Sequence, residues 1–342
     1  MVWERRWHPL REEWVTITSH RNHRPWSGSR LDARDEPLPD FAEDCYLCPG
    51  NQRVSGVKNE DYSSIFVFDN DHPAFTEHPE TVQQAHPFFN QEEAYGFCRV
   101  VCYSPWHNLS LAELSIARTL ELLEVWSVQT AELMSFDQVN NVFIFENRGE
   151  VVGVSNPHPH CQIYATGFVM KTIEQEVATC ARYMEKNQRK LFDDLVAAEL
   201  EDGRRVLVDN DRCCAFVPYF ARFPYETYIV PKSEVQFIHQ LDSEELLDLA
   251  KALHEVLVRY ENLWESPFPY ILTLHQAPCD GGDYNSYRFH IQIHPPMRQP
   301  GLQKFLAGTE TGAGTFLNDG CPEEKAAELR AVSDIHYKKP VS

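Results

Sequence analysis

Long hydrophobic runs are missing from this sequence of 342 residues. No stretch reaches the roughly 20 apolar residues that a membrane-spanning helix needs. Residues 1–6 (MVWERR) also lack the apolar core of a secretion signal. We therefore expect a protein without a membrane partner.

Basic residues are scarce as well: the chain has 31 Lys and Arg against 51 Asp and Glu, a net charge of -20. Non-specific nucleic-acid binding needs a positively charged surface, so this balance argues against a nucleic-acid partner. An anionic small molecule can still bind where basic groups gather locally. Arg21, Arg24 and Arg30 gather in this way around His20 and His23.

The chain has ten cysteines and no pattern of a secretion signal. In that context we expect reduced thiols or metal ligands rather than disulfides, and a cytoplasmic location. The 43% of hydrophobic and 24% of charged residues are typical of a globular protein. The length allows two average domains or one large one.

Sequence patterns predict strands and long helices in both halves of the chain. A capping box at 110–113 predicts a helix to about Ser135, and Asp242 caps a second helix that ends near Trp264. Another helical stretch is expected at 173–200. Runs rich in β-branched and aromatic residues predict strands at 64–69, 96–104, 141–146, 214–218, 227–231, 270–275 and 287–295.

The order of these elements is similar in the two halves. Each has a strand pair, a turn with Pro, a capped helix, a strand, a glycine-containing loop and a strand with polar residues at alternate positions. An internal duplication of roughly 130 residues explains this order, and chance similarity of two α+β segments is the alternative. We predict an α+β fold with related halves at 1–170 and 171–342, each a mainly antiparallel sheet with a long helix packed on it.

Two histidines stand two residues apart in the segment 155–162 (SNPHPHCQ). In extended chain alternate residues share a face, so His158, His160 and Gln162 would line one wall. The prolines of the segment cannot donate to a central ladder, which places this wall at a sheet edge or a strand end, within reach of a ligand. A Pro-rich turn that merely holds histidines is the alternative.

The corresponding strand of the second half differs at its middle position, because it carries His290, Gln292 and His294. A neutral imidazole can attack phosphorus and form a covalent intermediate, whereas a carboxamide cannot. If the middle position is the nucleophile, only His160 can react. The second wall would then be structural, metal-binding or sugar-facing.

Cys45 and Cys48 form a Cys-x-x-Cys pair. Alone, this pair fits a redox couple, half of a zinc site or two unrelated thiols, although the surrounding pattern of a thioredoxin-like unit is missing. Two thiolates and two imidazoles make a tetrahedral zinc site, and His107 and His158 are the histidines that we expect to complete it. Such a metal would fix the strand that presents His160.

Other polar residues give weaker signals. Asn70 and Asp71 follow a predicted strand and either form a turn or contact a ribose or a base. Asn147 lies before the His-rich segment, where it could reach a phosphate. Glu176 and His275 carry no signal on their own. The default interpretation is a surface carboxylate for Glu176 and a core histidine for His275.

With these residues assembled, the sequence resembles the galactose-1-phosphate uridylyltransferase family of the histidine-triad superfamily. The segment 155–162 is the most specific part, far more so than a bare His-x-His. The resemblance runs over nearly the whole chain and includes residues 20–26, 45–51, 145–149, 262–263, 267–270, 275, 295–296 and 328–332.

The resemblance implies two histidine-triad-like halves and a ping-pong reaction. UMP would pass from UDP-glucose to His160 and then to galactose 1-phosphate, with glucose 1-phosphate and UDP-galactose as products. It also implies a homodimer whose sites borrow residues from the partner subunit. A nucleotide-sugar or dinucleoside-polyphosphate phosphorylase using the same histidine is the alternative. A non-catalytic zinc-stabilised module is disfavoured because His160 is present.

The resemblance also implies roles for individual residues. His160 matches the nucleophile, and Ser155 and Gln162 match residues that contact the phosphates. The matching zinc ligands are Cys45, Cys48, His107 and His158. Nucleotide- and phosphate-binding positions match Arg21, Arg24, Asn70, Asp71 and Asn147, and the hexose-phosphate side matches Lys304, Phe305 and Glu310.

The chain departs from the family pattern at two positions. Some members hold a second metal, iron or zinc, with a Glu and three histidines. Glu176, His275 and His290 match three of these ligands, but Gln292 stands at the position of the third histidine. An amide oxygen is a poorer ligand than imidazole for such metals, unless His294 replaces it, as strand alternation permits. Secondly, Thr309 stands where some members have a Tyr that contacts the sugar, which leaves the hexose preference open.

Overall fold

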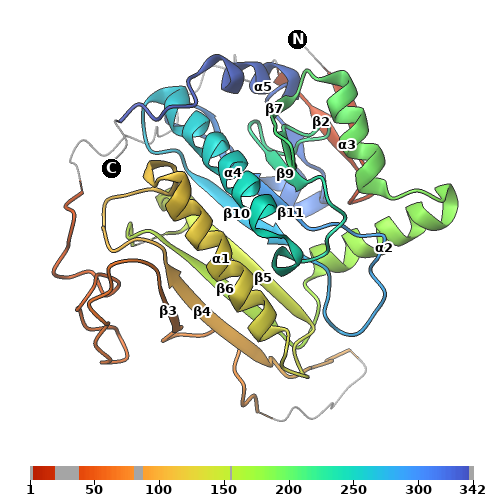
Figure 1. Cartoon of the computed structure of the whole chain (residues 1–342). Helices are drawn as coiled ribbons and strands as arrows, with labels where there is room; N and C mark the ends of the chain where they lie inside the picture. Colours follow the sequence, from red (N-terminus) through yellow and green to blue (C-terminus); the bar gives the residue numbers. More distant parts are fainter. Residues whose placement is uncertain (1–2, 20–37, 81–87, 155, 339–342) are drawn as a thin grey trace.

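The structure, a computed structural model, describes residues 3–19, 38–80, 88–154 and 156–338. Its centre is a nine-stranded sheet with the order β3-β4-β6-β5-β10-β11-β9-β8-β7, in which every neighbouring pair is antiparallel (Figure 1). The predicted α+β class is confirmed. The strands are β3 (Phe66–Asp69), β4 (Gly96–Cys102), β5 (Asn141–Arg148), β6 (His160–Thr166), β7 (Val206–Asp209), β8 (Cys213–Phe216), β9 (Thr227–Pro231), β10 (Tyr270–His275) and β11 (His290–His294).

The two halves share this one sheet. β5 from the first half pairs with β10 from the second over the register Tyr270↔Arg148 to Leu274↔Ile144. Each of these strands is flanked by a strand that begins with a histidine of the predicted walls, β6 with His160 beside β5 and β11 with His290 beside β10. The strand order therefore places the two histidine walls near the middle of one surface.

Two long helices cover one face of the sheet, α1 (Ile116–Leu133) and α4 (Ser243–Trp264), which lie side by side in Figure 1. Trp126 and Leu253 from these helices pack with Ile163 and Ile291 from the sheet in one buried core. Because side chains alternate along a strand, the histidines of β6 and β11 point to the other face.

The starts of the two helices differ in how well the sequence predicts them. Asp242 caps α4 as expected, because its carboxylate accepts hydrogen bonds from the N–H groups of Glu244 and Glu245. The capping box at 110–113 instead opens a 3₁₀ turn, η2 (Leu111–Glu113). Ser115 caps α1 two residues later.

The opposite face is covered, over the second half, by α2 (Lys171–Asn187) and α3 (Leu191–Asp202). The sequence predicts one helical stretch here, and the structure has two helices. Gln188 has a left-handed backbone with φ of 55° and ends α2. Phe192 at the start of α3 is fully buried and packs with Tyr228 of β9.

The remaining elements lie around this core. The hairpin of β1 and β2 pairs with β14 in a three-stranded sheet, and β12 pairs with β13. Their bounds are β1 (Glu4–His8), β2 (Glu13–Ile17), β12 (Met297–Gln299), β13 (Leu302–Gln303), β14 (Leu317–Asn318), α5 (Pro322–Ala331) and the short turns η3 (Glu150–Val152), η4 (Ile238–Gln240) and η5 (Gly308–Gly312).

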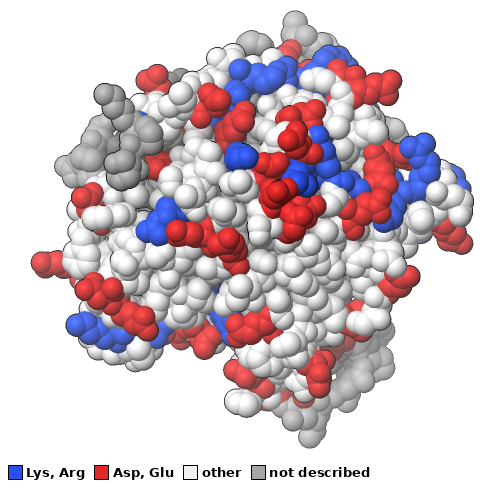
Figure 2. All heavy atoms as spheres, viewed as in Figure 1, with Lys and Arg blue, Asp and Glu red and all other residues white. Residues whose placement is uncertain are grey.

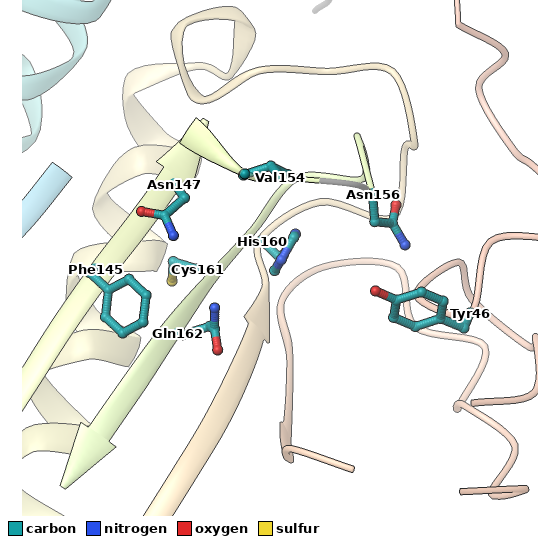
Figure 3. A pocket seen from close by; sticks show the side chains of 9 residues that line it. Tyr46, Phe145, Asn147, Val154, Asn156, His160, Cys161 and Gln162 are labelled. Atoms are coloured by element: carbon teal, nitrogen blue, oxygen red, sulfur yellow. The ribbon is translucent and has the colours of Figure 1, made fainter. Parts of the chain in front are cut away.

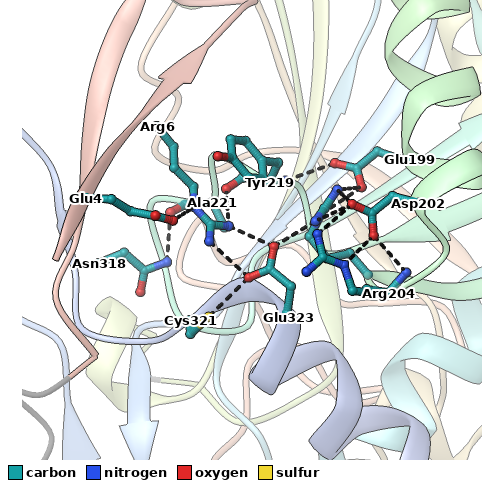
Figure 4. Close-up of polar contacts among 11 residues, drawn as sticks. Glu4, Arg6, Glu199, Asp202, Arg204, Tyr219, Ala221, Asn318, Cys321 and Glu323 are labelled. Carbon is teal, nitrogen blue, oxygen red and sulfur yellow. Dashed lines mark hydrogen bonds and ion pairs between the residues drawn. The ribbon is translucent and has the colours of Figure 1, made fainter. Parts of the chain in front are cut away.

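A polar network links β1, α5, the end of α3 and the segment around Tyr219 (Figure 4). Arg6 donates two hydrogen bonds to Glu323, at 2.9 and 3.1 Å, and its guanidinium lies 4.1 Å from the centre of the Tyr219 ring. Arg205 donates to the same carboxylate at 2.7 Å and to Glu199 at 2.8 Å. Because both arginines are buried, removing one partner would leave a buried charge unpaired, which costs more stability than the loss of a surface ion pair.

Acidic and basic side chains alternate in small groups over the helical face seen in Figure 2. Among the described residues in that view, no continuous basic area is present. No helix of the described ranges is both long and apolar enough to cross a membrane.

Candidate active site and metal centre

The His-rich segment enters the sheet at the start of β6, where His160 pairs with Cys102 of β4. β6 lies between β4 and β5, so the segment is at a strand end and not at a sheet edge. Cys161 and Ile163 point into the helix-covered core. His160 and Gln162 therefore point to the opposite face, as the alternation predicts.

A cavity of about 190 Å³ opens beside His160 (Figure 3). Most of its lining side chains are polar, which suits a phosphate or a sugar better than an apolar ligand. Its lining residues are Tyr46, Phe145, Asn147, Gly153, Val154, Asn156, His160, Cys161 and Gln162.

The tautomer of His160 is set by the backbone. Its Nδ1 lies 2.8 Å from the carbonyl oxygen of His158, and because a carbonyl only accepts, Nδ1 carries the hydrogen. Nε2 is then the atom with the free lone pair. Burial lowers the pKa of His160, as does Arg148 nearby, while the hydrogen bond to His158 acts in the other direction. The imidazole is therefore held neutral, the form that a nucleophile needs.

Gln162 lies next to His160, with its amide oriented by two neighbours. Its Oε1 accepts hydrogen bonds from Asn70 Nδ2 and from the hydroxyl of Tyr164, both at 3.4 Å. Its Nε2 has no partner among the described residues, and Figure 3 shows the side chain beside His160. The amide can thus donate to an oxygen in the cavity.

The other predicted nucleotide contacts are distributed unevenly. Asn147, on β5, lines the cavity. Asn70 reaches the site through Gln162. Asp71 instead accepts from the backbone N–H of Ser55 and lies 3.6 Å from Arg53. The predicted contacts Arg21, Arg24 and Ser155 lie outside the described residues.

The four predicted zinc ligands meet in one buried cluster. The ligand atoms of Cys45, Cys48, His107 and His158 lie within 4.8 Å of one another. Cys48 Sγ is 3.6 Å from Nδ1 of each histidine. Zinc bonds of about 2.3 Å to sulfur and about 2.05 Å to nitrogen, at the tetrahedral angle, place these atoms about 3.6 Å apart. The cluster thus has the spacing of a tetrahedral metal site.

The ligand chemistry fits a cation as well. Burial, with His107 and His160 nearby, lowers the pKa of His158 to about 3, so its imidazole is neutral, as a ligand must be. Burial raises the pKa of Cys48 to about 11, so its thiolate form needs a cation beside it. His158 Nε2 donates to the carbonyl oxygen of Ser104 at 3.0 Å and lies 2.9 Å from the Tyr62 hydroxyl, which directs Nδ1 at the cluster.

Asn156 connects the cluster with the cavity, although no separate sequence signal pointed to it. Its Oδ1 accepts from the backbone N–H of His158 at 3.0 Å, and its Nδ2 donates to Cys45 Sγ at 3.4 Å. It also lines the cavity beside His160, as does Tyr46 between the two cysteines. Its place in the segment 155–162 is the one hint that could have found it.

The predicted hexose-phosphate residues form a separate group. Lys304 Nζ donates to Glu310 at 3.0 Å and to the carbonyl oxygen of Leu317 at 2.6 Å. Thr309 donates to the same Glu310 carboxylate at 2.8 Å, and Phe305 is exposed. None of these residues is among the described residues that line the cavity.

The predicted second metal group also comes together, with one correction. Glu176, His275 and His290 meet in a buried cluster. His294 does not join it, because its ring lies beside Glu226, with Nδ1 3.8 Å from that carboxylate. The suggestion that His294 replaces the missing histidine is therefore wrong, and Gln292 occupies the position.

Comparison with known proteins settles the family. The family described as "Galactose-1-phosphate uridyl transferase, N-terminal domain" matches residues 1–170, and its C-terminal domain counterpart matches residues 176–340. The chain belongs to the galactose-1-phosphate uridyl transferase family. The predicted family and the class of nucleotidyltransferase are thereby confirmed.

Relatives match over nearly their full lengths. The galactose-1-phosphate uridylyltransferase of Haemophilus influenzae is 37% identical, over 98% of this chain and 96% of the relative. The Rattus norvegicus enzyme is 33% identical, over 97% of this chain and 88% of its own.

Solved structures agree with this family assignment. A structure described as uridylyltransferase has a TM-score of 0.77 at 27% identity, covering 96% of this chain and 97% of that one. An Arabidopsis thaliana ADP-glucose phosphorylase has the same TM-score at 22% identity, covering 97% of this chain and 99% of that one. The latter similarity is one of fold.

Proposed function

We propose that this protein transfers UMP from UDP-glucose to galactose 1-phosphate through a uridylyl group on His160, releasing glucose 1-phosphate and then UDP-galactose. The observation that carries the proposal is the hydrogen bond from His160 Nδ1 to the His158 carbonyl oxygen. It leaves Nε2 as a neutral nucleophile at a polar cavity.

The first half-reaction uses these atoms directly. The Nε2 lone pair attacks the α-phosphorus of UDP-glucose, an N–P bond forms, and the P–O bond to glucose 1-phosphate breaks with its electron pair. The hydrogen on Nδ1 stays in its bond to the His158 carbonyl, which stabilises the positive charge that develops on the ring. A sugar phosphate is a good leaving group, so positioning and charge stabilisation matter more than a strong general acid.

The second half-reaction reverses the first with another sugar. A phosphate oxygen of galactose 1-phosphate attacks the uridylyl phosphorus, and the N–P bond breaks to return the lone pair to Nε2. In both directions the Gln162 amide donates to a phosphoryl oxygen. Because an amide does not ionise at working pH, it adds no negative charge and supplies no proton. Asn147 and Asn70 would act with it on the phosphates or nucleotide, and Arg21, Arg24, Asp71 and Ser155 complete the proposed set.

We assign Zn²⁺ to the cluster of Cys45, Cys48, His107 and His158. Four protein ligands fill a tetrahedral zinc site, so the metal has no open position for substrate and its role is structural. It would hold His158 and, through the next two residues, the nucleophile.

We propose a homodimer in which the hexose-phosphate side of each site comes from the partner subunit. The separation of the Lys304, Phe305 and Glu310 group from the cavity within one chain supports this arrangement. We also propose a cytoplasmic location, because none of the ten cysteines forms a disulfide, as expected in a reducing compartment.

Initial-rate kinetics test the function. With UDP-glucose and galactose 1-phosphate varied together, a ping-pong enzyme gives parallel double-reciprocal lines and forms UDP-galactose. A phosphorylase would instead transfer the nucleotidyl group from the same histidine to inorganic phosphate. Product formation with phosphate but not with galactose 1-phosphate would overturn the proposal in favour of that alternative.

A further inference from the structure

A second cluster of metal-ligating side chains lies under the β1–β2 hairpin, apart from the zinc cluster. It contains Glu176 from α2, His275 from β10 and His290 from β11. Two more side chains enter it: Gln292 from β11, and Arg11 from the turn between β1 and β2. We infer that this cluster holds no second metal. Arg11 supplies the positive charge, and Gln292 donates hydrogen bonds to the ligand atoms, in place of a cation.

The distances in the cluster are those of direct hydrogen bonds. His275 Nδ1 lies 2.8 Å from Glu176 Oε2, and Gln292 Nε2 lies 2.9 Å from His290 Nε2. Two ligands at about 2.0–2.2 Å from a tetrahedral zinc ion lie about 3.4 Å apart and turn their lone pairs towards the ion. Here the lone pairs of Glu176 Oε2 and His290 Nε2 accept hydrogens from His275 and Gln292. In the zinc cluster the distances from Cys48 Sγ to the two histidine nitrogens are 3.6 Å.

The orientation of the Gln292 amide follows from its neighbours. His290 Nδ1 donates to the carbonyl oxygen of Arg288 at 3.0 Å, so its Nε2 can only accept, and it accepts from Gln292 Nε2. Nε2 also donates to Glu176 Oε1 at 3.1 Å. An amide ligates a metal through its oxygen, and Gln292 turns its hydrogens to the cluster and its Oε1 to Arg11, 3.5 Å away.

Glu176 has a full set of partners within the protein. Its Oε2 accepts from His275 and from the Tyr287 hydroxyl, at 2.8 and 2.9 Å. Its Oε1 accepts from Gln292 and lies 3.5 Å from the Arg11 guanidinium. The carboxylate is fully buried, so it requires a positive charge, and Arg11 provides it. A divalent cation placed here would be repelled by that guanidinium.

The cluster has a structural consequence for the hairpin. The backbone carbonyl of Arg11 accepts a hydrogen bond from the Gln175 side chain, and its guanidinium donates to Thr172, both on α2. Arg11 therefore ties the β1–β2 turn to α2 and to the sheet.

Metal analysis of the wild-type homodimer tests the inference without any activity readout, so its outcome is separable from that of the proposed function. After incubation with excess zinc and iron and gel filtration, we expect one metal per subunit, and none in Cys45→Ser/Cys48→Ser. A second metal that remains in this double variant, and disappears in Glu176→Gln, would overturn the inference.

A converted variant tests the parts played by Arg11 and Gln292. Arg11→Ala/Gln292→His removes the guanidinium and supplies a third imidazole, and we expect it to bind a second metal per subunit and to melt at a higher temperature with that metal than without it. Arg182→Ala/Gln292→His is the control, because Arg182 also links α2 to the hairpin, through Glu12, but on the surface. It should stay at one metal. A folded converted variant with one metal, or a control with two, would contradict the role given to Arg11. If the converted variant does not fold, the wild-type stoichiometry decides alone.

Discussion

His160 Nδ1 donates a hydrogen bond to the backbone carbonyl oxygen of His158, 2.8 Å away, and the ring of His158 in turn faces Cys48 Sγ at 3.6 Å. His160, the proposed nucleophile, and His158, a proposed zinc ligand, are thus only two residues apart. The cluster fixes the backbone of His158, and that backbone fixes the tautomer and the direction of the His160 ring. Several expectations come from this arrangement.

Removing the thiolates should impair the chemistry although neither cysteine lines the cavity. Cys45→Ser/Cys48→Ser should lose zinc and lower kcat by about 10–100-fold, the range seen when groups that orient a site are removed. Elemental analysis and steady-state kinetics check this. Cys279→Ser is the control, because that thiol bonds to the carbonyl oxygen of Val139, on the other side of the sheet. Equal activity in the double variant and wild type would show that the cluster does not position His160.

Tyr62→Phe should weaken zinc binding by a smaller step. The hydroxyl donates to the Leu47 carbonyl oxygen at 2.7 Å and lies 2.9 Å from His158 Nε2, so it positions one ligand and the loop that carries two others. We expect about a 10-fold faster loss of zinc to a chromogenic chelator, since partners of metal ligands contribute on this scale. Tyr183→Phe, a hydroxyl bonded to Asp194 on another part of the chain, should release zinc at the wild-type rate.

Gln162 is expected to act through its amide hydrogens. Gln162→Ala removes one donor to the phosphoryl oxygen and should lower kcat by about 10²–10³-fold, as loss of such a donor does in other enzymes. Gln162→Glu should be slower still, because a carboxylate of the same shape would repel the phosphate. Single-turnover rates with UDP-glucose measure both. A Glu variant that is faster than the Ala variant would contradict a donor role.

The Glu323 network predicts a pH dependence of stability. Burial alone would raise the pKa of Glu323, but hydrogen bonds from Arg6 and Cys321 lower it to about 2. A carboxylate whose pKa falls on folding stabilises the protein above its unfolded pKa of about 4.3 and loses that contribution as the pH falls towards 2. Glu323→Gln should therefore unfold more easily than wild type at pH 7, by about 1–3 kcal/mol, and the difference should shrink between pH 4.5 and 2.

Urea unfolding of both proteins across this pH range measures the effect. Glu121→Gln is the control, because its exposed pair with Arg118 should contribute only about 0.3–0.5 kcal/mol. A Glu323→Gln difference that stayed constant down to pH 2 would show that the carboxylate charge is not responsible.

Much of the fold and part of the site could be predicted from local sequence. Asp242 starts α4 because its carboxylate bonds the first N–H groups of the helix, a purely local effect. The alternation of His290, Gln292 and His294 with buried isoleucines predicts the strand β11, and this pattern is local too. The Cys-x-x-Cys pair predicted Cys45 as a metal ligand before the structure placed it in the cluster.

Features that depend on contacts between distant segments were not predictable. Two serines precede α1, and Ser115 rather than Ser110 caps it, because Ser110 opens the 3₁₀ turn η2, which contacts α4. The pairing of β5 with β10, which merges the halves into one sheet, joins residues far apart in the chain. Arg11 carries no sequence signal, since its role arises only when the hairpin meets α2.

Intact-mass spectrometry after incubation with UDP-glucose alone shows whether His160 carries UMP. We predict one UMP adduct per subunit, its loss on addition of galactose 1-phosphate, and no adduct in His160→Asn. His72→Asn, which removes an exposed histidine, should be modified like wild type. The absence of an adduct in active wild-type protein, or an adduct that persists in His160→Asn, would contradict the mechanism.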